Sequence, residues 1–138
     1  MTSGIDPEAN FDTIYRAMHD AQAAGADMLF TPEMSLHLDR NRKRATKAVR
    51  SVDDTAMRDR LANASEEYRL YTSVGVPLAL GDERNTNRQW LFVPSGERPH
   101  HYDKTHMFDV ELSTGETWRE SNAYKPGEEL AVIEDTPI

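Results

Sequence analysis

A long amphipathic helix followed directly by a short apolar segment is the feature that most limits the fold of this chain. Asp6 is a favourable N-cap, Pro7 suits the first helical position, and Gly25 is typical of a helix end. Between them, apolar residues recur at helical spacing, at Phe11, Ile14, Met18 and Ala21. We therefore predict a helix over about 7–24 with one apolar face packed against a core.

The apolar run at 27–31 comes immediately after this helix and has the length of a buried strand. Pro32 ends the run, and Glu33 follows at its C-terminal end. A helix leading into a strand is typical of layered α/β folds, in which ligands gather beyond the C-terminal ends of the strands. By position alone, a glutamate such as Glu33 is more often a solvated loop residue than a functional one.

A second amphipathic helix is predicted from Asp53 and Asp54 to about Arg69. Its apolar positions also recur at helical spacing, at Met57, Leu61, Ala64 and Tyr68. Before it, the stretch 40–50 is basic, with Arg40, Arg42, Lys43, Arg44, Lys47 and Arg50. This stretch is either an anion-binding or nuclear-targeting patch or a solvated helix face, and the acidic remainder of the chain favours the solvated face.

The second half of the chain is predicted to be rich in strands. The segment 71–80 has the composition of a central strand, with Pro77 at a bulge or an edge position. The segments 89–93 and 100–106 are predicted as a hairpin around a turn at 94–97, with Trp90 and Phe92 in the core. The remaining expectations are a turn at 85–87, mostly loop at 115–127, and a last short strand at 130–133.

The overall charge and composition exclude several classes of protein. The net charge is −8, and an acidic chain is poorly suited to bind nucleic acid or an anionic membrane surface. The sequence has neither an apolar run of about 18 residues nor a signal-peptide pattern, so we expect a cytoplasmic location. It contains no cysteine, which excludes disulfides and cysteine–zinc sites within these 138 residues.

Three polar segments carry a more specific signal: Thr-Pro-Glu at 31–33, Tyr-Asp-Lys-Thr-His-Met-Phe-Asp at 102–109, and Arg-Glu-Ser-Asn at 119–122. In this order and spacing they resemble the nitrilase superfamily of carbon–nitrogen hydrolases. The opening Met-Thr-Ser-Gly, Gly-Ala-Asp at 25–27 and Tyr-Lys-Pro-Gly-Glu-Glu at 124–129 extend the resemblance along the chain. The likeness is closest to the branch of amidases that act on deaminated glutathione and on ω-amides of 2-oxo acids.

This resemblance implies a fold and three catalytic residues. Residues 1–138 would be the N-terminal part of a four-layer α/β/β/α sandwich, a partial domain whose first strand and C-terminal half lie outside this sequence. Glu33 matches the general base of the family, Lys104 the lysine that stabilises the tetrahedral intermediate, and Glu120 a second glutamate that positions substrate and lysine. The family nucleophile is a cysteine in a segment after the strand near Ile133, so we expect residues 1–138 alone to be inactive.

The chemistry agrees with these residue types. An amide is a poor electrophile, and a covalent intermediate divides its cleavage into two easier steps. A carboxylate can deprotonate a thiol, and a nearby ammonium can lower the thiol pKa and neutralise the developing oxyanion. Two carboxylates around one ammonium also favour its charged form.

Other residues near these motifs are less specific candidates for the site. His106 and Phe108 are expected to line the pocket close to Lys104, whereas Arg119 could bind a substrate carboxylate or form a structural salt bridge. Histidines and aspartates also cluster here, at His100, His101, His106, Asp103 and Asp109. Hydrogen bonding at a polar strand end explains them better than metal binding, so we expect no metal ion and no organic cofactor.

The function expected from the resemblance is hydrolysis of a small linear amide to a carboxylic acid and ammonia, by an enzyme that forms homo-oligomers, usually dimers. Nitrile or carbamoyl hydrolysis within the same superfamily stays open. The main alternative is a non-catalytic truncated partner that co-assembles with a full-length homologue, and the absence of cysteine favours it.

Overall fold

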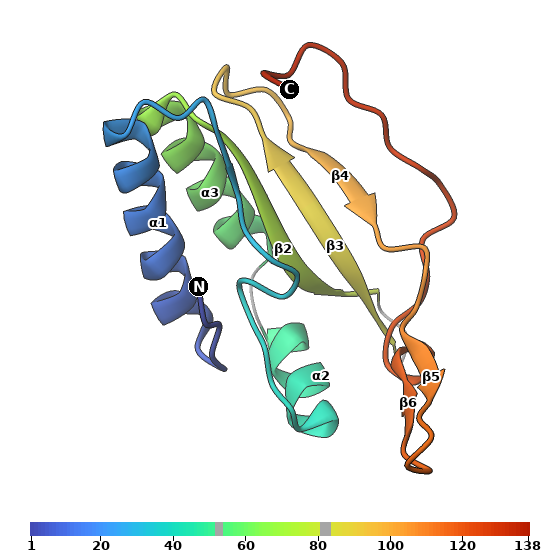
Figure 1. Ribbon diagram of the computed structural model, residues 1–138. Helices are drawn as coiled ribbons and strands as arrows, with labels where there is room; N and C mark the ends of the chain where they lie inside the picture. Colours follow the sequence, from blue (N-terminus) through green and yellow to red (C-terminus); the bar gives the residue numbers. More distant parts are fainter. Residues whose placement is uncertain (52–53, 81–83) are drawn as a thin grey trace.

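The computed structural model describes residues 1–51, 54–80 and 84–138, which form a layer of helices on a four-stranded sheet (Figure 1). The helices are α1 (Pro7–Ala23), α2 (Arg42–Ser51) and α3 (Asp54–Tyr68). The sheet contains β1 (Met28–Phe30), β2 (Tyr71–Ala79), β3 (Asn85–Phe92) and β4 (His100–Asp103), side by side in that order. A separate ladder joins β5 (Asp109–Glu111) to β6 (Thr117–Arg119), and the 3-10 helix η1 (Glu120–Asn122) follows it.

The sheet is mixed: β1 is parallel to β2, whereas β2–β3 and β3–β4 are antiparallel pairs. Figure 1 shows α1 and α3 on one face of this sheet, and the C-terminal segment running outside β4. None of the helices in the described part of the chain is both long and apolar enough to cross a membrane.

Helix α1 forms as its sequence predicts. The side chain of Asp6 accepts hydrogen bonds from the backbone N–H groups of Glu8 (3.0 Å) and Ala9 (3.5 Å), so the N-cap is confirmed. The helix ends at Ala23, one residue before the predicted end, and Gly25 then takes a left-handed φ of 77°. Its apolar face is buried at Phe11, Ile14 and Met18.

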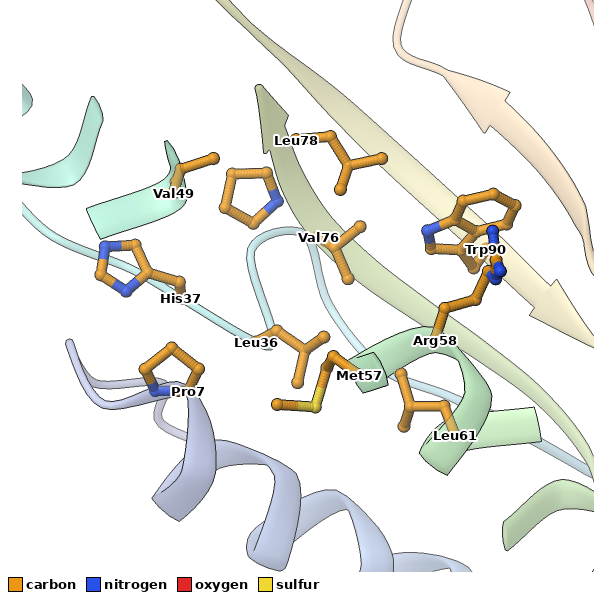
Figure 2. Close-up of a pocket in the computed structure, with 11 residues that line it drawn as sticks. Pro7, Leu36, His37, Val49, Met57, Arg58, Leu61, Val76, Leu78 and Trp90 are labelled. Atoms are coloured by element: carbon orange, nitrogen blue, oxygen red, sulfur yellow. The ribbon is translucent and has the colours of Figure 1, made fainter. Parts of the chain in front are cut away.

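The loop after β1 is held against α1 and β2 by buried hydrogen bonds. Asn10 Nδ2 donates to the carbonyl of Leu36 at 2.8 Å, and the backbone N–H of Leu36 donates to the carbonyl of Gly75 at 3.3 Å. Leu36 and His37 are therefore buried, and they line a small cavity of about 30 Å³ whose other walls are mostly apolar (Figure 2).

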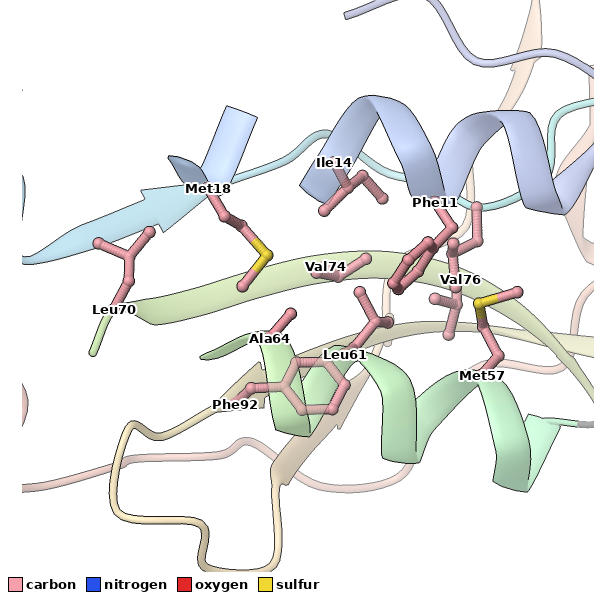
Figure 3. Packing of buried hydrophobic residues seen from close by; sticks show 11 residues of the cluster. Phe11, Ile14, Met18, Met57, Leu61, Ala64, Leu70, Val74, Val76 and Phe92 are labelled. Atoms are coloured by element: carbon pink, nitrogen blue, oxygen red, sulfur yellow. The ribbon is translucent and has the colours of Figure 1, made fainter. Parts of the chain in front are cut away.

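The hydrophobic core lies between the two long helices and the sheet (Figure 3). Met18 from α1 and Leu61 from α3 meet Val74 on β2 and Phe92 on β3, and each is at most 1% exposed. Burying a side chain of this size stabilises the fold by about 1.5–3 kcal/mol. Trp90 packs against the edge of the cluster, so the predicted core positions of Phe92 and Trp90 are confirmed.

The two other helical predictions also agree with the structure. Helix α3 begins at Asp54, whereas Asp53 lies outside the described residues. The basic stretch forms α2, and its described cations Arg44 and Lys47 are exposed while Val49 is buried. The structure thus confirms a helix with these cations exposed, and the choice of a solvated face over an anion-binding patch stays a prediction.

Two strand predictions need correction. Strand β1 was predicted to be buried, but Phe30 is 59% exposed, because β1 has a neighbour on one side only among the described strands. At Pro77 the β2–β3 register runs without a bulge, since Pro77 pairs with Asn87 in sequence with its neighbours. The alternative of an edge position is confirmed for this end of β2. Strand β1 pairs only with residues 71–73, so no described strand lies beside Pro77 on the side opposite β3.

Sequence patterns were also wrong at three other places. The predicted turn at 85–87 is the start of β3, and the predicted strand at 100–106 ends at Asp103. The segment 115–127 is mostly loop, as predicted, with the three-residue strand β6 inside it, paired with β5. The segment 130–133 is not a strand; Leu130 and Val132 are 81% and 87% exposed, and no described strand pairs with them.

Candidate active site

Glu33 lies just beyond the C-terminal end of β1, in a turn fastened to β2. The backbone N–H of Thr31 donates to the carbonyl of Ser73 at 2.8 Å, which continues the parallel pairing by one residue. The next residue after Glu33, Met34, has a left-handed φ of 56°. A non-glycine residue in this conformation is strained by about 1–3 kcal/mol, and such strain is typical of functional sites.

Lys104 follows the last residue of β4. Its backbone N–H donates to the carbonyl of Asn87 on β3 at 2.9 Å, and its own carbonyl accepts from Gly127 N–H at 2.9 Å. Strand β3 on one side and Gly127 on the other therefore fix the backbone of Lys104. The side chain of Lys104 is 23% exposed. The hairpin of β3 and β4 thus brings Lys104 beside a residue 17 positions earlier in the chain.

Glu120 is positioned by the β5–β6 ladder. Asp109 pairs with Arg119 in this ladder, so the residues beyond each strand end, Phe108 and Glu120, lie opposite one another. The backbone N–H of Glu120 donates to the carbonyl of Phe108 at 3.2 Å, and the N–H of Phe108 donates to Glu120 Oε2 at 2.7 Å. The backbone N–H and the hydroxyl of Ser121 donate to the carboxylate of Asp109, which holds the residues after β6 against the start of β5.

The three predicted catalytic residues meet in one cluster. Lys104 Nζ lies 3.3 Å from Glu33 Oε2 and 3.0 Å from Glu120 Oε2. The side chain of Asn87 completes the cluster, since its Nδ2 lies 3.0 Å from Glu33 Oε2 and 3.4 Å from Glu120 Oε1. The ammonium is therefore held between two carboxylates that come from segments 87 residues apart.

Charge and hydrogen bonding set the protonation of this cluster. Burial lowers the pKa of Lys104, but the hydrogen bond and charge of Glu120, followed by the charge of Glu33, outweigh burial and hold that pKa above its ordinary value. Burial raises the pKa of Glu120, but the backbone N–H of Phe108, then Lys104 and Asn87, hold it below its ordinary value. Lys104 and Glu120 are thus a charged pair at neutral pH.

The cluster borders an open hollow of about 410 Å³. Glu33, Lys104 and Glu120 form its charged wall, and the other lining residues are Phe108, Trp118, Ala123 and Tyr124. The structure therefore brings the predicted pocket residue Phe108 to the catalytic candidates. Phe108 and Trp118 are 57% and 48% exposed, so the hollow presents two aromatic side chains to solvent.

The other two predicted pocket residues do not line this hollow. His106 is exposed and its Nδ1 lies 3.1 Å from the hydroxyl of Thr105. Arg119 Nη2 forms an ion pair with Glu111 Oε1 at 2.5 Å across the β5–β6 ladder. Of the two alternatives weighed for Arg119, the structure contains the salt bridge.

Asn87, Trp118, Ala123 and Tyr124 were not predicted as site residues. Asn87 was part of the predicted turn at 85–87, because asparagine followed closely by another asparagine is a common turn signal. The only sequence signal for Trp118 as a site residue is its position, since this aromatic residue directly precedes the Arg-Glu-Ser-Asn motif. Among the described residues, no group of three or more histidine, cysteine or acidic side chains is arranged to hold a metal ion.

The chemical capacity of the site follows from this arrangement. An exposed carboxylate can accept a proton, and an adjacent ammonium can stabilise negative charge that develops on an oxygen. The small apolar cavity in Figure 2 lacks this pair, since its lining includes the cation Arg58 but no carboxylate.

Comparison with known proteins places this chain in a family. The chain is 31% identical over 119 residues to a deaminated glutathione amidase from Yersinia enterocolitica, covering 83% of this chain and 41% of that protein. A deaminated glutathione amidase from Bos taurus is 28% identical over 149 residues, covering 99% of this chain and 43% of that protein. The chain thus spans about two fifths of the length of these curated relatives.

Solved structures share the fold. The NitFhit protein of C. elegans superposes with a TM-score of 0.83 at 24% identity, over 99% of this chain and 34% of that protein. An amidase from Nesterenkonia sp. superposes with a TM-score of 0.71 at 24% identity, over 94% of this chain and 46% of that protein. These matches confirm the predicted fold class, the N-terminal part of the nitrilase sandwich. The family model for carbon-nitrogen hydrolases matches residues 1–138, and the chain therefore belongs to the carbon-nitrogen hydrolase family.

Proposed function

We propose that the protein containing this chain hydrolyses a small linear amide to a carboxylic acid and ammonia. In this proposal Glu33 is the general base, Lys104 stabilises the tetrahedral intermediate, and Glu120 positions Lys104. The nucleophile is a cysteine supplied from outside residues 1–138, because these residues contain none. No metal or organic cofactor takes part.

One observation carries the proposal: Lys104 Nζ lies between Glu33 Oε2 and Glu120 Oε2, at 3.3 Å and 3.0 Å, on the wall of a hollow open to solvent. The two carboxylates differ in exposure, at 59% for Glu33 and 15% for Glu120. This difference supports different roles, because a base must be accessible to the group that it deprotonates, whereas a positioning carboxylate is best held by fixed donors.

Acylation would begin when Glu33 takes the thiol proton and the thiolate attacks the amide carbon. A carbon–sulfur bond forms, and the carbonyl electron pair moves to the oxygen beside the Lys104 ammonium. When the tetrahedral intermediate collapses, the carbon–nitrogen bond breaks, and Glu33 returns its proton to the departing ammonia. A thioester remains on the enzyme.

Deacylation would repeat these proton transfers with water. Glu33 takes a proton from water, and the hydroxide attacks the thioester carbon. The carbon–sulfur bond then breaks to release the carboxylic acid, and Glu33 returns its proton to the departing cysteine sulfur. The similar amidase from Nesterenkonia sp. supports the assignment of the nucleophile. In one of its variants, which has glutamine in place of a glutamate, acrylamide is added to the active-site cysteine.

The test uses the protein as its gene encodes it, with ammonia release from linear ω-amides as the assay. We expect Lys104→Ala to lower kcat/KM by about 10²–10³-fold, the range found when one oxyanion donor is removed. Glu33→Gln should abolish detectable turnover, because the glutamine side chain cannot accept the thiol proton. Lys125→Ala is the matched control, since Lys125 is 45% exposed and pairs with Glu128 at 3.7 Å.

Circular dichroism and thermal unfolding show whether each variant is folded. Substantial ammonia release by folded Lys104→Ala or Glu33→Gln protein would overturn the assigned roles. Release of ammonia by residues 1–138 alone would overturn the need for an external nucleophile.

The second candidate function is a non-catalytic partner, and the absence of cysteine from 138 residues favours it. The DNA sequence beyond Ile138 discriminates the two. An in-frame segment with a cysteine supports the enzyme, whereas a stop codon together with co-purification of a full-length homologue supports the partner.

The proposal includes assembly into homo-oligomers, which the family resemblance implies, and a cytoplasmic location, which was expected from the sequence pattern. Sedimentation velocity of the natural protein tests the first, and cell fractionation tests the second.

A further inference from the structure

Asn87 is the side chain in the cluster that no catalytic motif contains. It lies on β3, opposite Pro77 in the β2–β3 register, and is 4% exposed. Its backbone carbonyl accepts the N–H of Lys104 at 2.9 Å. The backbone of Asn87 therefore anchors the lysine independently of its side chain, which is free to contact the carboxylates.

The side-chain amide of Asn87 bridges both glutamates. Its Nδ2 lies 3.0 Å from Glu33 Oε2 and 3.4 Å from Glu120 Oε1. Lys104 Nζ contacts the same two oxygen atoms, each at 3.3 Å. Because both neighbours of the amide are carboxylate oxygens, the nitrogen must face them, and its two N–H groups match the two acceptors.

We propose that Asn87 is a positioning residue for the amide hydrolysis proposed above, which fixes Glu33 relative to Lys104 and Glu120. This inference rests on the proposed function for its catalytic consequence. Its structural basis, a buried neutral donor between two acidic side chains, does not depend on that function.

A neutral donor serves this purpose better than a second cation. Without Asn87, one ammonium would have to hold two carboxylates, and the 59% exposed side chain of Glu33 would lose its shortest hydrogen bond. A second lysine would add a positive charge and compete with Lys104 for Glu120. An amide donates directional N–H groups and leaves the charge of Lys104 available for the developing oxyanion.

Three variants of the natural protein test the inference. Asn87→Leu removes both N–H groups with little change in size, and Asn87→Asp keeps the shape but replaces the donors by a third carboxylate. Gln89→Leu is the matched control. Gln89 is an amide on the same strand and face, but its Nε2 donates to Ser73 Oγ at 2.8 Å and to the carbonyl of Thr31 at 3.4 Å, and not to the carboxylates.

The first readout is the pH profile of kcat/KM for ammonia release. The hydrogen bond from Asn87 is one of the causes that hold the pKa of Glu120 below its ordinary value, so Asn87→Leu should move the acid limb of the profile to higher pH. Asn87→Asp should move the limb further in the same direction, because like charges disfavour ionisation. In Asn87→Leu, kcat should fall about tenfold while KM stays within about threefold. Gln89→Leu should leave the limb unmoved.

The second readout does not need activity, and it separates failure of this inference from failure of the proposed function. The pKa of Glu120 is held below its ordinary value, so its ionised form stabilises the fold above the unfolded pKa, and this contribution is lost as pH falls through the lower folded pKa. The Tm difference between wild type and Asn87→Leu should therefore be constant at neutral pH and shrink below about pH 4.3, whereas the difference for Gln89→Leu should not change there.

The outcomes are distinct. If wild type releases no ammonia but the Tm difference shrinks with pH, the proposed function fails and the electrostatic role of Asn87 stands. If the Tm difference is independent of pH and an active Asn87→Leu protein keeps its acid limb, Asn87 is a structural residue only and the inference is overturned. Should Asn87→Leu not fold, the same two measurements on the nearly isosteric Asn87→Asp decide the matter.

Discussion

Gly75 is predicted to control the position of Glu33, although it contributes no side chain to the site. It lies on β2 in close contact with the turn that follows β1, and this contact leaves no room for a Cβ atom. A Cβ at Gly75 would lie 2.8 Å from Glu33 Cα and would overlap the carbonyl oxygen of Pro32. Ordinary contacts of this kind begin at 3.4 Å, so Gly75→Ala must push the two backbones apart.

The size of the displacement can be worked out from these distances. Glu33 Cα must move by about 0.6 Å or more, because two of the three atoms that the new methyl group would meet belong to backbone and cannot rotate away. The third atom is Oε1 of the Gln89 side chain, at 3.0 Å. Strand β2 is held along its length by β3, so the turn moves rather than the strand. The 3.3 Å contact between Glu33 Oε2 and Lys104 Nζ would then reach about 3.9 Å, beyond hydrogen-bonding distance.

We expect Gly75→Ala to lower kcat/KM by about 10- to 100-fold, since misplacement of a catalytic group by 1 Å can cost 10²-fold. The overpacking should also destabilise the fold by about 1–3 kcal/mol. The assay is ammonia release by the natural protein, together with thermal unfolding. Gly4→Ala is the control, because a Cβ there would meet only Asn10 Oδ1, at 4.0 Å. A folded Gly75→Ala protein with wild-type kcat/KM would refute the reasoning.

Two further predictions concern stability. The pKa of Glu120 is held below its ordinary value, so its charged form stabilises the fold above the unfolded pKa, and this contribution is lost as pH falls through the lower folded pKa. Thermal unfolding should therefore show a smaller loss of stability below about pH 4.3 in Glu120→Gln than in wild type, and equal losses would contradict the assignment. His37 is 4% exposed and neither ring nitrogen has a hydrogen-bond partner among the described residues. His37→Leu should raise the free energy of unfolding by about 1–3 kcal/mol in urea titrations, and a loss of stability would show that the ring makes an essential bond.

The sequence predicted the parts of the fold that local patterns determine. Helix α1 combines an N-cap at Asp6, a proline at the first position and an apolar face, and these signals agree with one another. The cluster of Glu33, Lys104 and Glu120 was predicted from motifs, and the structure brings the three side chains within hydrogen-bonding distance. Their catalytic roles stay predictions.

The failures have a common physical cause, which is that a pattern does not identify its distant partners. The segment 85–87 has the composition of a turn, yet its side chains are at most 4% exposed. Asn85 is paired through its backbone with residues 123 and 125, and the side chain of Asn87 bonds to the two glutamates. The converse holds at 130–133, where a strand-like apolar composition has no described partner strand and stays exposed.

The two glutamates of the cluster differ in environment, and this difference supports the two roles proposed for them. Glu120 is committed to fixed donors, because its oxygen atoms accept from Lys104 Nζ, Asn87 Nδ2 and the backbone N–H of Phe108. In the described part of the chain, the hydrogen bonds to Glu33 reach Oε2 alone, which leaves Oε1 to accept a proton. A base needs a free lone pair and access to its substrate, and a positioning group needs neither. This asymmetry is why we propose that Glu33 rather than Glu120 deprotonates the nucleophile, and why Asn87, which holds Glu33 through the oxygen already bound to Lys104, can orient the base without blocking it.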